Sequence, residues 1–226
     1  MTDATFFKML GVKNIWAIDH SDYEGAEVIA NLNQPLPENL YGIADFIFGG
    51  SVCDNVFDPA MYLRNVSRML KPGGRLVDQN IITDSYHPYA ILTTAWYYDY
   101  FVINKFADCK IYVIECSSPL NFYGLDADED SDVIFNFKPR DIDHAVGIFL
   151  IAERGIDSTF DVNPSQDQYR GADEWALYRE NLRTLKASPR PYFPLRIPPE
   201  NQLGIASPLQ LAGYRFLGRL SRDIPE

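Results

Sequence analysis

Three stretches between residues 44 and 78 decide the fold: Ala44-Asp-Phe-Ile-Phe48, Asp58-Pro59 and Lys71-Pro-Gly-Gly-Arg-Leu-Val-Asp78. The first is expected to be a strand that ends in Gly49-Gly50-Ser51. Asp58 is a good N-cap and Pro59 suits the first helical position, so a helix is expected to begin here. Lys71-Pro-Gly-Gly is expected to end that helix, and a strand follows. The three stretches predict a strand–helix–strand unit.

Further elements are expected on both sides of this unit. The apolar run Asn14–Ile18 ends abruptly at Asp19 and predicts a parallel strand covered on both faces, and Gly25–Ala30 is a weaker strand candidate. Strands that alternate with helices indicate an α/β sheet with a parallel centre. The remaining expected elements are helices at Ala4–Leu10 and Ala172–Leu185, strands at Lys110–Glu115 and Ala145–Glu153, and an aromatic-rich segment, Tyr86–Phe106, that is helical in its second half.

Composition narrows the range of partners. The chain has 226 residues, of which 46% are hydrophobic, and this length supports one well-buried core. It carries 20 Lys+Arg against 31 Asp+Glu, a net charge of −11, so its field repels phosphate. We therefore expect neither a nucleic-acid nor a membrane partner.

The cysteine spacing and the first residues of the sequence indicate where the protein is located and whether it has a metal site. Three cysteines, Cys53, Cys109 and Cys116, have no metal-ligand or redox spacing and are expected to be small buried side chains in a reducing compartment. No basic region followed by an apolar run opens the chain, and no apolar run is long enough to span a membrane. We expect a cytoplasmic protein without a metal site.

The ordered residues resemble class I S-adenosylmethionine-dependent methyltransferases. The resemblance rests on Ala44–Phe48, on Ser51-Val-Cys-Asp-Asn-Val-Phe-Asp-Pro59, and on Arg68-Met-Leu-Lys-Pro-Gly-Gly-Arg-Leu-Val77, and it spans Phe6 to Glu153. It implies a Rossmann-like, mostly parallel sheet with helices on both faces. It also implies a methyltransferase-like domain over residues 1–155 and a C-terminal extension over residues 156–226 that packs on the same domain.

The resemblance implies that S-adenosylmethionine is the cofactor and places the ends of the second and third family strands against it. Asp19 would accept hydrogen bonds from both ribose hydroxyls, because one carboxylate can accept from two adjacent hydroxyls. The alternative is that Asp19 only caps the helix expected near Ser21. His20 would pack on the cofactor or lie on the surface. Asn31 stands where the family often has an aspartate that accepts from the adenine amino group, and the backbone amide of Leu32 would contact the ring.

The end of the fourth family strand completes the implied site. Gly49, Gly50 and Ser51 would border the methionine part of the cofactor, and a simple tight turn is the equal alternative. The family's glycine-rich loop follows its first strand, which lies between strands two and four, but no such motif precedes Phe6. The resemblance therefore implies a sheet that is incomplete at its N-terminus. A miscalled start codon, a gene fragment and a degenerate, cofactor-free relative remain open.

The chemistry expected of such a protein is methyl transfer to a small-molecule or sugar-containing acceptor. His87, with Asp84 and Tyr86 as weaker candidates, follows the fifth family strand and is the candidate general base. An ordinary turn histidine is the alternative. The aromatic cluster Trp96–Phe101 would wall the acceptor pocket or pack in the core, and the acidic stretch Asp126–Asp132 lacks calcium-loop spacing and is expected to be solvated.

Two other functional classes are alternatives to an active methyltransferase. The first is a catalytically inactive pseudo-methyltransferase, or a truncated module, that acts as a binding or interaction module. An apolar surface where the first strand would lie then favours a homo-oligomer or a protein partner. The second is a nicotinamide dehydrogenase, which shares an acidic residue after its second strand but also requires a glycine fingerprint.

Overall fold

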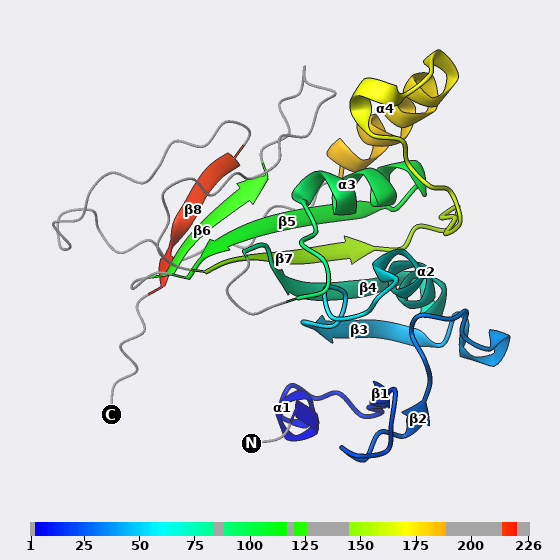
Figure 1. Cartoon of the computed structure of the whole chain (residues 1–226), viewed down its shortest axis with the longest axis vertical. Helices are drawn as coiled ribbons and strands as arrows, with labels where there is room; N and C mark the ends of the chain where they lie inside the picture. Colours follow the sequence, from blue (N-terminus) through cyan, green and yellow to red (C-terminus); the bar gives the residue numbers. More distant parts are fainter. Residues whose placement is uncertain (1–2, 84–87, 117–119, 126–144, 189–213, 221–226) are drawn as a thin grey trace, which may run out of the picture.

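The computed structural model describes residues 3–83, 88–116, 120–125, 145–188 and 214–220. Six strands form one sheet, and two very short strands form a separate parallel pair beside it (Figure 1). The six strands, in their order across the sheet, are β3 (Ala44–Gly50), β4 (Leu70–Ile81), β7 (Val146–Glu153), β5 (Asp108–Glu115), β6 (Leu120–Leu125) and β8 (Tyr214–Leu220). The separate pair consists of β1 (Ile18–Asp19) and β2 (Val28–Ile29).

The large sheet is mixed. Only β3 and β4 pair in parallel, whereas β7 lies antiparallel between β4 and β5, and β6 and β8 continue in antiparallel pairs. The expected α/β class is confirmed, but the expected mostly parallel sheet is not. The physical reason is the position of β7, which lies between β4 and β5 and runs antiparallel to both of them.

Helices lie on both faces at the β3 edge. On β4, Asp78 contacts Tyr62 of α2 (Pro59–Met69) and Asn80 contacts Tyr97 of α3 (Thr94–Ile103), so both helices cover one face. Side chains alternate between faces along a strand, which puts Phe46 and Phe48 of β3 on the opposite face from Gly49. There the Phe7 ring of α1 (Asp3–Met9) contacts both of them, with centroids 6.0 and 5.7 Å away.

Helix α2 begins as the sequence indicates. The Asp58 side chain accepts a hydrogen bond from the Met61 amide at 2.9 Å, and Pro59 is the first helical residue. The Lys-Pro-Gly-Gly stretch, however, belongs to β4 rather than to the end of the helix. Its four residues form an irregularity in the parallel ladder, with Gly73 at a φ of +80°, and Lys71 forms an ion pair with Asp45. The helix ends at Met69, directly before this stretch, and the strand begins at Leu70 rather than after Gly74.

The other expected elements are found with altered lengths. Strands β1 and β2 have two residues each, so they are shorter than the expected strands at Asn14–Ile18 and Gly25–Ala30. The first helix is confirmed and is followed by Gly11 at a φ of +86°. The last expected helix is α4 (Ala172–Lys186), which packs on α3 through a hydrogen bond from Tyr178 to Asp99. Of the aromatic cluster, Tyr97, Tyr98, Tyr100 and Phe101 are buried in the core, as one of the two interpretations held, and Trp96 packs against the core but is only partly buried.

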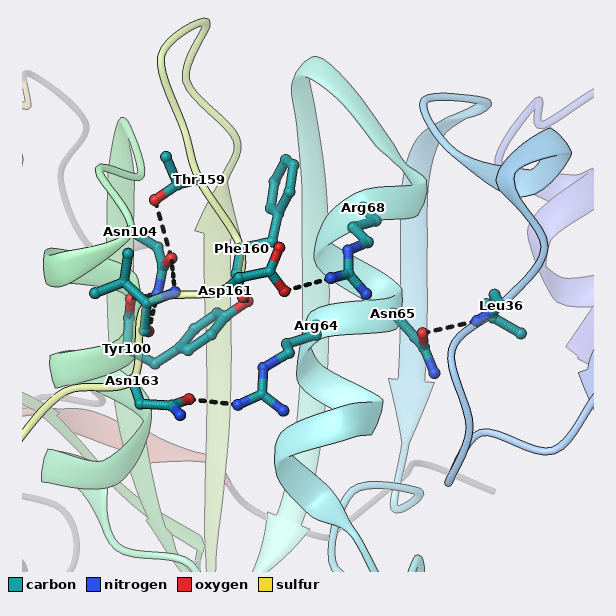
Figure 2. Close-up of polar contacts among 11 residues, drawn as sticks. Leu36, Arg64, Asn65, Arg68, Tyr100, Asn104, Thr159, Phe160, Asp161 and Asn163 are labelled. Atoms are coloured by element: carbon teal, nitrogen blue, oxygen red, sulfur yellow. Dashed lines mark hydrogen bonds and ion pairs between the residues drawn. The ribbon is translucent and has the colours of Figure 1, made fainter.

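A segment after β7, residues 159–163, contacts both α2 and α3 and is called the strap below (Figure 2). The Asn104 side chain accepts from the Val162 amide at 3.2 Å and donates to the Val162 carbonyl at 2.9 Å. The Tyr100 hydroxyl donates to the Phe160 carbonyl at 3.1 Å, and Arg68 pairs with Asp161. These contacts fix both helices against the same connecting segment.

Asn65 on α2 fixes the segment that follows β2. Its side chain is fully buried and accepts from the Leu36 amide at 3.1 Å (Figure 2). The same side chain donates to the carbonyls of Leu32 and Gln34 at 3.1 and 2.8 Å. One side chain thus satisfies three backbone groups of a segment without regular structure.

We expect Asn65→Ala to lower the free energy of unfolding by about 3 kcal/mol, because three backbone groups would lose their partner. Urea denaturation followed by circular dichroism measures the effect. Asn39→Ala, at an exposed position, is the matched control and should change stability by less than about 0.5 kcal/mol. A loss similar to that of the control would show that these hydrogen bonds do not stabilise the fold.

Candidate functional site at the ends of β3 and β4

A buried polar cluster lies where β3 and β4 end and the chain turns toward α2 and α3. The Tyr62 hydroxyl donates to Asp78 Oδ1 at 3.3 Å. Asn80 Nδ2 lies 3.2 Å from Asp78 Oδ2 and 2.7 Å from the Tyr97 hydroxyl. All four side chains are almost completely buried, and the Cys53 thiol lies beside them. In α/β sheets this edge, at the carboxyl ends of parallel strands, is where ligands commonly bind.

Burial determines the charge state of this cluster. It raises the pKa of Asp78 to about 7, although the hydrogen bonds from Asn80 and Tyr62 oppose the shift. Burial also raises the pKa of the Tyr62 hydroxyl and of the Cys53 thiol well above their ordinary values, with the nearby Asp78 carboxylate as a second cause. Asp78 is therefore the group of this cluster that gains or loses its proton near neutrality.

Gly49 makes room for the cluster. It is the β3 residue paired with Asp78 across the parallel ladder. A Cβ atom at this position would lie 2.0 Å from the Tyr62 hydroxyl oxygen and 2.5 Å from Asp78 Oδ1. Only glycine allows the hydroxyl of α2 to reach the carboxylate of β4 here.

Asp54 organises the loop that follows β3. Its side chain accepts from the Ile81 amide at 3.2 Å, and its carbonyl oxygen accepts from the Tyr89 and Ala90 amides at 2.8 and 3.2 Å. Its own amide donates to Asn80 Oδ1 at 3.2 Å, which links this loop to the buried cluster. Burial raises the pKa of the Asp54 carboxyl as well. The loops after β3 and β4 are thus held to each other.

Two aromatic side chains project outward from these held loops. Phe57 is 84% exposed and Tyr89 is 76% exposed, and their rings meet edge to face with centroids 6.2 Å apart. Exposed rings on a fixed backbone are suited to contact with an apolar ring face of a ligand. Sequence reasoning named Gly49 only as a neighbour of the methionine part of the cofactor, and it missed Phe57, Tyr89, Asp78 and Asn80. Their only signal was their position after the expected strands.

Gly50 and Ser51 lie at the expected place, at the end of β3. Both are exposed, and Ser51 adopts a φ of +59°, which is uncommon for a residue with a side chain. The Ser51 amide donates to the Gln79 carbonyl at 2.8 Å, and its carbonyl accepts from Asn55 at 2.8 Å. A strained, exposed turn therefore borders the buried cluster.

The side chains at the ends of β1 and β2 accept hydrogen bonds from the turns that follow these strands. Asp19 Oδ1 accepts from the Ser21 amide at 3.0 Å, and His20 is exposed. Asn31 Oδ1 accepts from both the amide and the side chain of Asn33, each at 3.0 Å. A carbonyl oxygen has two lone pairs, so an adenine amino group would have to replace one of these bonds. Leu32 is partly buried between the two core clusters.

Asn33 connects these turns to the loop after β3. Its Oδ1 atom accepts from the amide of Asp58, the N-cap of α2, at 2.8 Å. This contact joins the turn that holds Asn31 and Leu32 to the far end of the loop that follows Gly50 and Ser51. His87, Asp84, Tyr86 and the acidic stretch at 126–132 lie outside the described residues.

Within the described residues, no three His, Cys, Asp or Glu side chains come together as a metal site would require. No helix in this part of the chain has the length and apolar character to cross a membrane. No family model, no curated protein and no solved structure matches the chain.

The pKa of Asp78 makes stability depend on pH. Because this pKa is about 7 in the folded state and 3.8 ordinarily, the folded state holds the proton more tightly. The stabilisation is complete at acidic pH and is lost as the pH rises toward 7. We expect the native protein to lose roughly 4 kcal/mol relative to Asp78→Asn between about pH 4 and about pH 8. Urea denaturation of both proteins at several pH values measures this difference, and a pH-independent difference would contradict it.

We expect Gly49→Ala to lower the free energy of unfolding by about 2 kcal/mol or more, because the added methyl group overlaps the Tyr62 hydroxyl. Adding Tyr62→Phe to this variant should restore part of the loss. Gly171→Ala, which has nothing within 4 Å of the new Cβ atom, is the control and should cost less than about 1 kcal/mol. Equal losses for both alanine variants in thermal and urea unfolding would exclude the proposed overlap.

Proposed function

We propose that this chain is an S-adenosylmethionine-binding, methyltransferase-like protein with a Rossmann-like core and a small-molecule or sugar-containing acceptor. The parallel β3–α2–β4 unit supports the proposal, since units of this kind bind ligands outside their carboxyl ends. The separate parallel pair β1–β2 beside the β3 edge also fits, because the resembling family has a further strand between its second and fourth strands.

One observation carries the proposal. The 2.8 Å hydrogen bond between the Asp58 amide and Asn33 brings the turn after β2 to the loop after β3. The residues that the resemblance assigns to adenine and to the methionine part thus come from segments that touch. Asp19 of β1 lies close to the turn after β2, because it pairs with Ile29 and its carbonyl oxygen accepts from the Ala30 amide at 2.8 Å.

The residues present fit the ribose part of such a cofactor. Asp19 is half-buried and uses one carboxylate oxygen for the Ser21 amide, which leaves acceptor capacity for a diol. The glycine-rich loop of the family has no counterpart in these 226 residues. Binding would therefore rest on the three strand ends, and Asn31 would have to exchange one internal hydrogen bond.

The acceptor would lie beside the loops that Asp54 fixes. The exposed rings of Phe57 and Tyr89 offer an apolar surface there for a ring of the acceptor. The cofactor would supply an electrophilic methyl group, and the acceptor hydroxyl would lose its proton to a base, for which His87 remains the candidate. Asp54 and Asp78 would act as positioning residues, because their buried hydrogen bonds hold the loops in place.

Calorimetric titration with S-adenosylhomocysteine tests this function. We expect micromolar binding, and we expect Asp19→Asn to weaken it by about tenfold or more, because the amide keeps the acceptor for Ser21 but loses the charge. Asp22→Asn, at an exposed position of the same turn, is the control and should bind within about twofold.

Absence of heat with the folded native protein would overturn the proposed cofactor. Equal affinity of Asp19→Asn and Asp22→Asn would instead remove Asp19 from the site and leave the cofactor in place.

A further inference from the structure

The first 35 residues form a layer that the rest of the described chain covers only in part. In Figure 1, α1, β1 and β2 lie along the free side of β3. The Phe7 ring meets Phe46 and Phe48 of β3, and one side chain each from β1 and β2 packs on the cluster around Met69. No residue from 4 to 35 is buried, so this layer, called the N-terminal layer below, keeps apolar side chains in contact with solvent.

Two exposed groups on this layer have a common pattern. The first, called the basic group, is Lys8–Lys13, in which Met9 and Leu10 are 75% and 65% exposed between two exposed lysines. The second, called the acidic group, is Asp22–Glu24, in which Tyr23 is 90% exposed between two exposed carboxylates. Each group therefore places apolar side chains between charges of one sign, and the sign is opposite in the two groups.

The two groups lie near each other on the layer. Hydrogen bonds from the Ala17 and Glu27 amides lower the pKa of the Glu27 carboxyl, and the Lys8 charge adds to this shift, so α1 lies close to the turn between β1 and β2. Among the described residues, no ion pair uses any of the four charged side chains of the two groups, Lys8, Lys13, Asp22 and Glu24. Their charges are therefore available for a contact with another molecule.

We propose that two copies of this chain associate through their N-terminal layers, with the basic group of each copy against the acidic group of the other. The lysines of one copy then pair with the carboxylates of the other, and Tyr23 covers Met9 and Leu10 of the opposite copy. The apolar side chains form the centre of the contact and the charges form its rim, which is the usual division in protein interfaces.

A second copy suits this surface better than a different protein does. A surface that carries both a group and its complement matches itself about a two-fold axis, because each contact is then made twice. A partner with charges of one sign would be attracted to one group and repelled by the other. The association uses neither Asp19 nor the cofactor, so it does not rest on the proposed function.

The net charge sets the conditions under which the association is measured. Each chain carries −11, so two copies repel each other at long range. At about 0.15 M salt this repulsion is screened beyond about 8 Å, whereas opposite charges in contact are screened less.

Sedimentation velocity at this ionic strength tests the proposal. We expect the native chain to form a dimer with a dissociation constant in the micromolar range. The double variants Lys8→Glu/Lys13→Glu and Asp22→Lys/Glu24→Lys should each raise this constant by about tenfold or more, because like charges then meet. An equimolar mixture of the two variants should form a one-to-one heterodimer, since one copy then carries only acidic charges at both groups and the other only basic charges.

Lys105→Glu/Arg183→Glu is the matched control. It reverses two exposed positive charges outside the N-terminal layer and changes the net charge by the same amount as Lys8→Glu/Lys13→Glu. This control should form dimers as the native chain does. Equal circular dichroism spectra and unfolding midpoints establish that all three double variants are folded.

A native chain that stays monomeric at about 100 µM would overturn the proposal. So would a native dimer that both variants of the N-terminal layer keep, because its interface would then lie elsewhere. Weakened variants whose mixture stays monomeric would also overturn it, since their loss of association would not come from the pairing of the two groups.

Discussion

The parallel pairing of β3 with β4 places Gly49 opposite Asp78, and much of the central structure depends on this pairing. The absence of a side chain at Gly49 lets the Tyr62 hydroxyl of α2 reach the Asp78 carboxylate. Asn80, two residues further along β4, connects the same carboxylate to α3 and to the loop after β3. Two strands, two helices and one loop are therefore joined by a few buried polar atoms. Buried polar networks of this kind favour one arrangement, because any other leaves a group without a partner.

The two halves of the molecule differ in how they are held. From β4 to α4, helices and strands pack on a continuous core, and the strap at residues 159–163 binds both α2 and α3 (Figure 2). The N-terminal segment that holds α1, β1 and β2 is attached by Asn65, Asn33, the Phe7 ring and the small cluster around Met69. Cofactor binding would stabilise the turns after β1 and β2, which belong to this less covered half.

Local signals in the sequence predicted several elements well. The helix start at Asp58-Pro59 and the strand at residues 146–153 follow from capping chemistry and apolar runs, which act between near neighbours. The Lys-Pro-Gly-Gly stretch misled because glycine and proline usually end a helix, whereas here they form an irregular entry into β4 that hydrogen-bonds with Arg154. The direction of β7 was also missed, since an apolar run does not say which way a strand runs.

The candidate site also combines residues that local sequence signals placed with residues that only the tertiary structure brings together. The sequence by itself determined which turns follow the strands, and so it placed Gly50 and Ser51 at the end of β3 and Asp19 at the end of β1. Tertiary structure alone decided that Asp78, Asn80, Tyr62 and Tyr97 meet and that the pKa of Asp78 rises. These residues are up to 35 positions apart in the sequence. Strand order and helix packing bring them together, and burial then changes their chemistry, so no local pattern could indicate either.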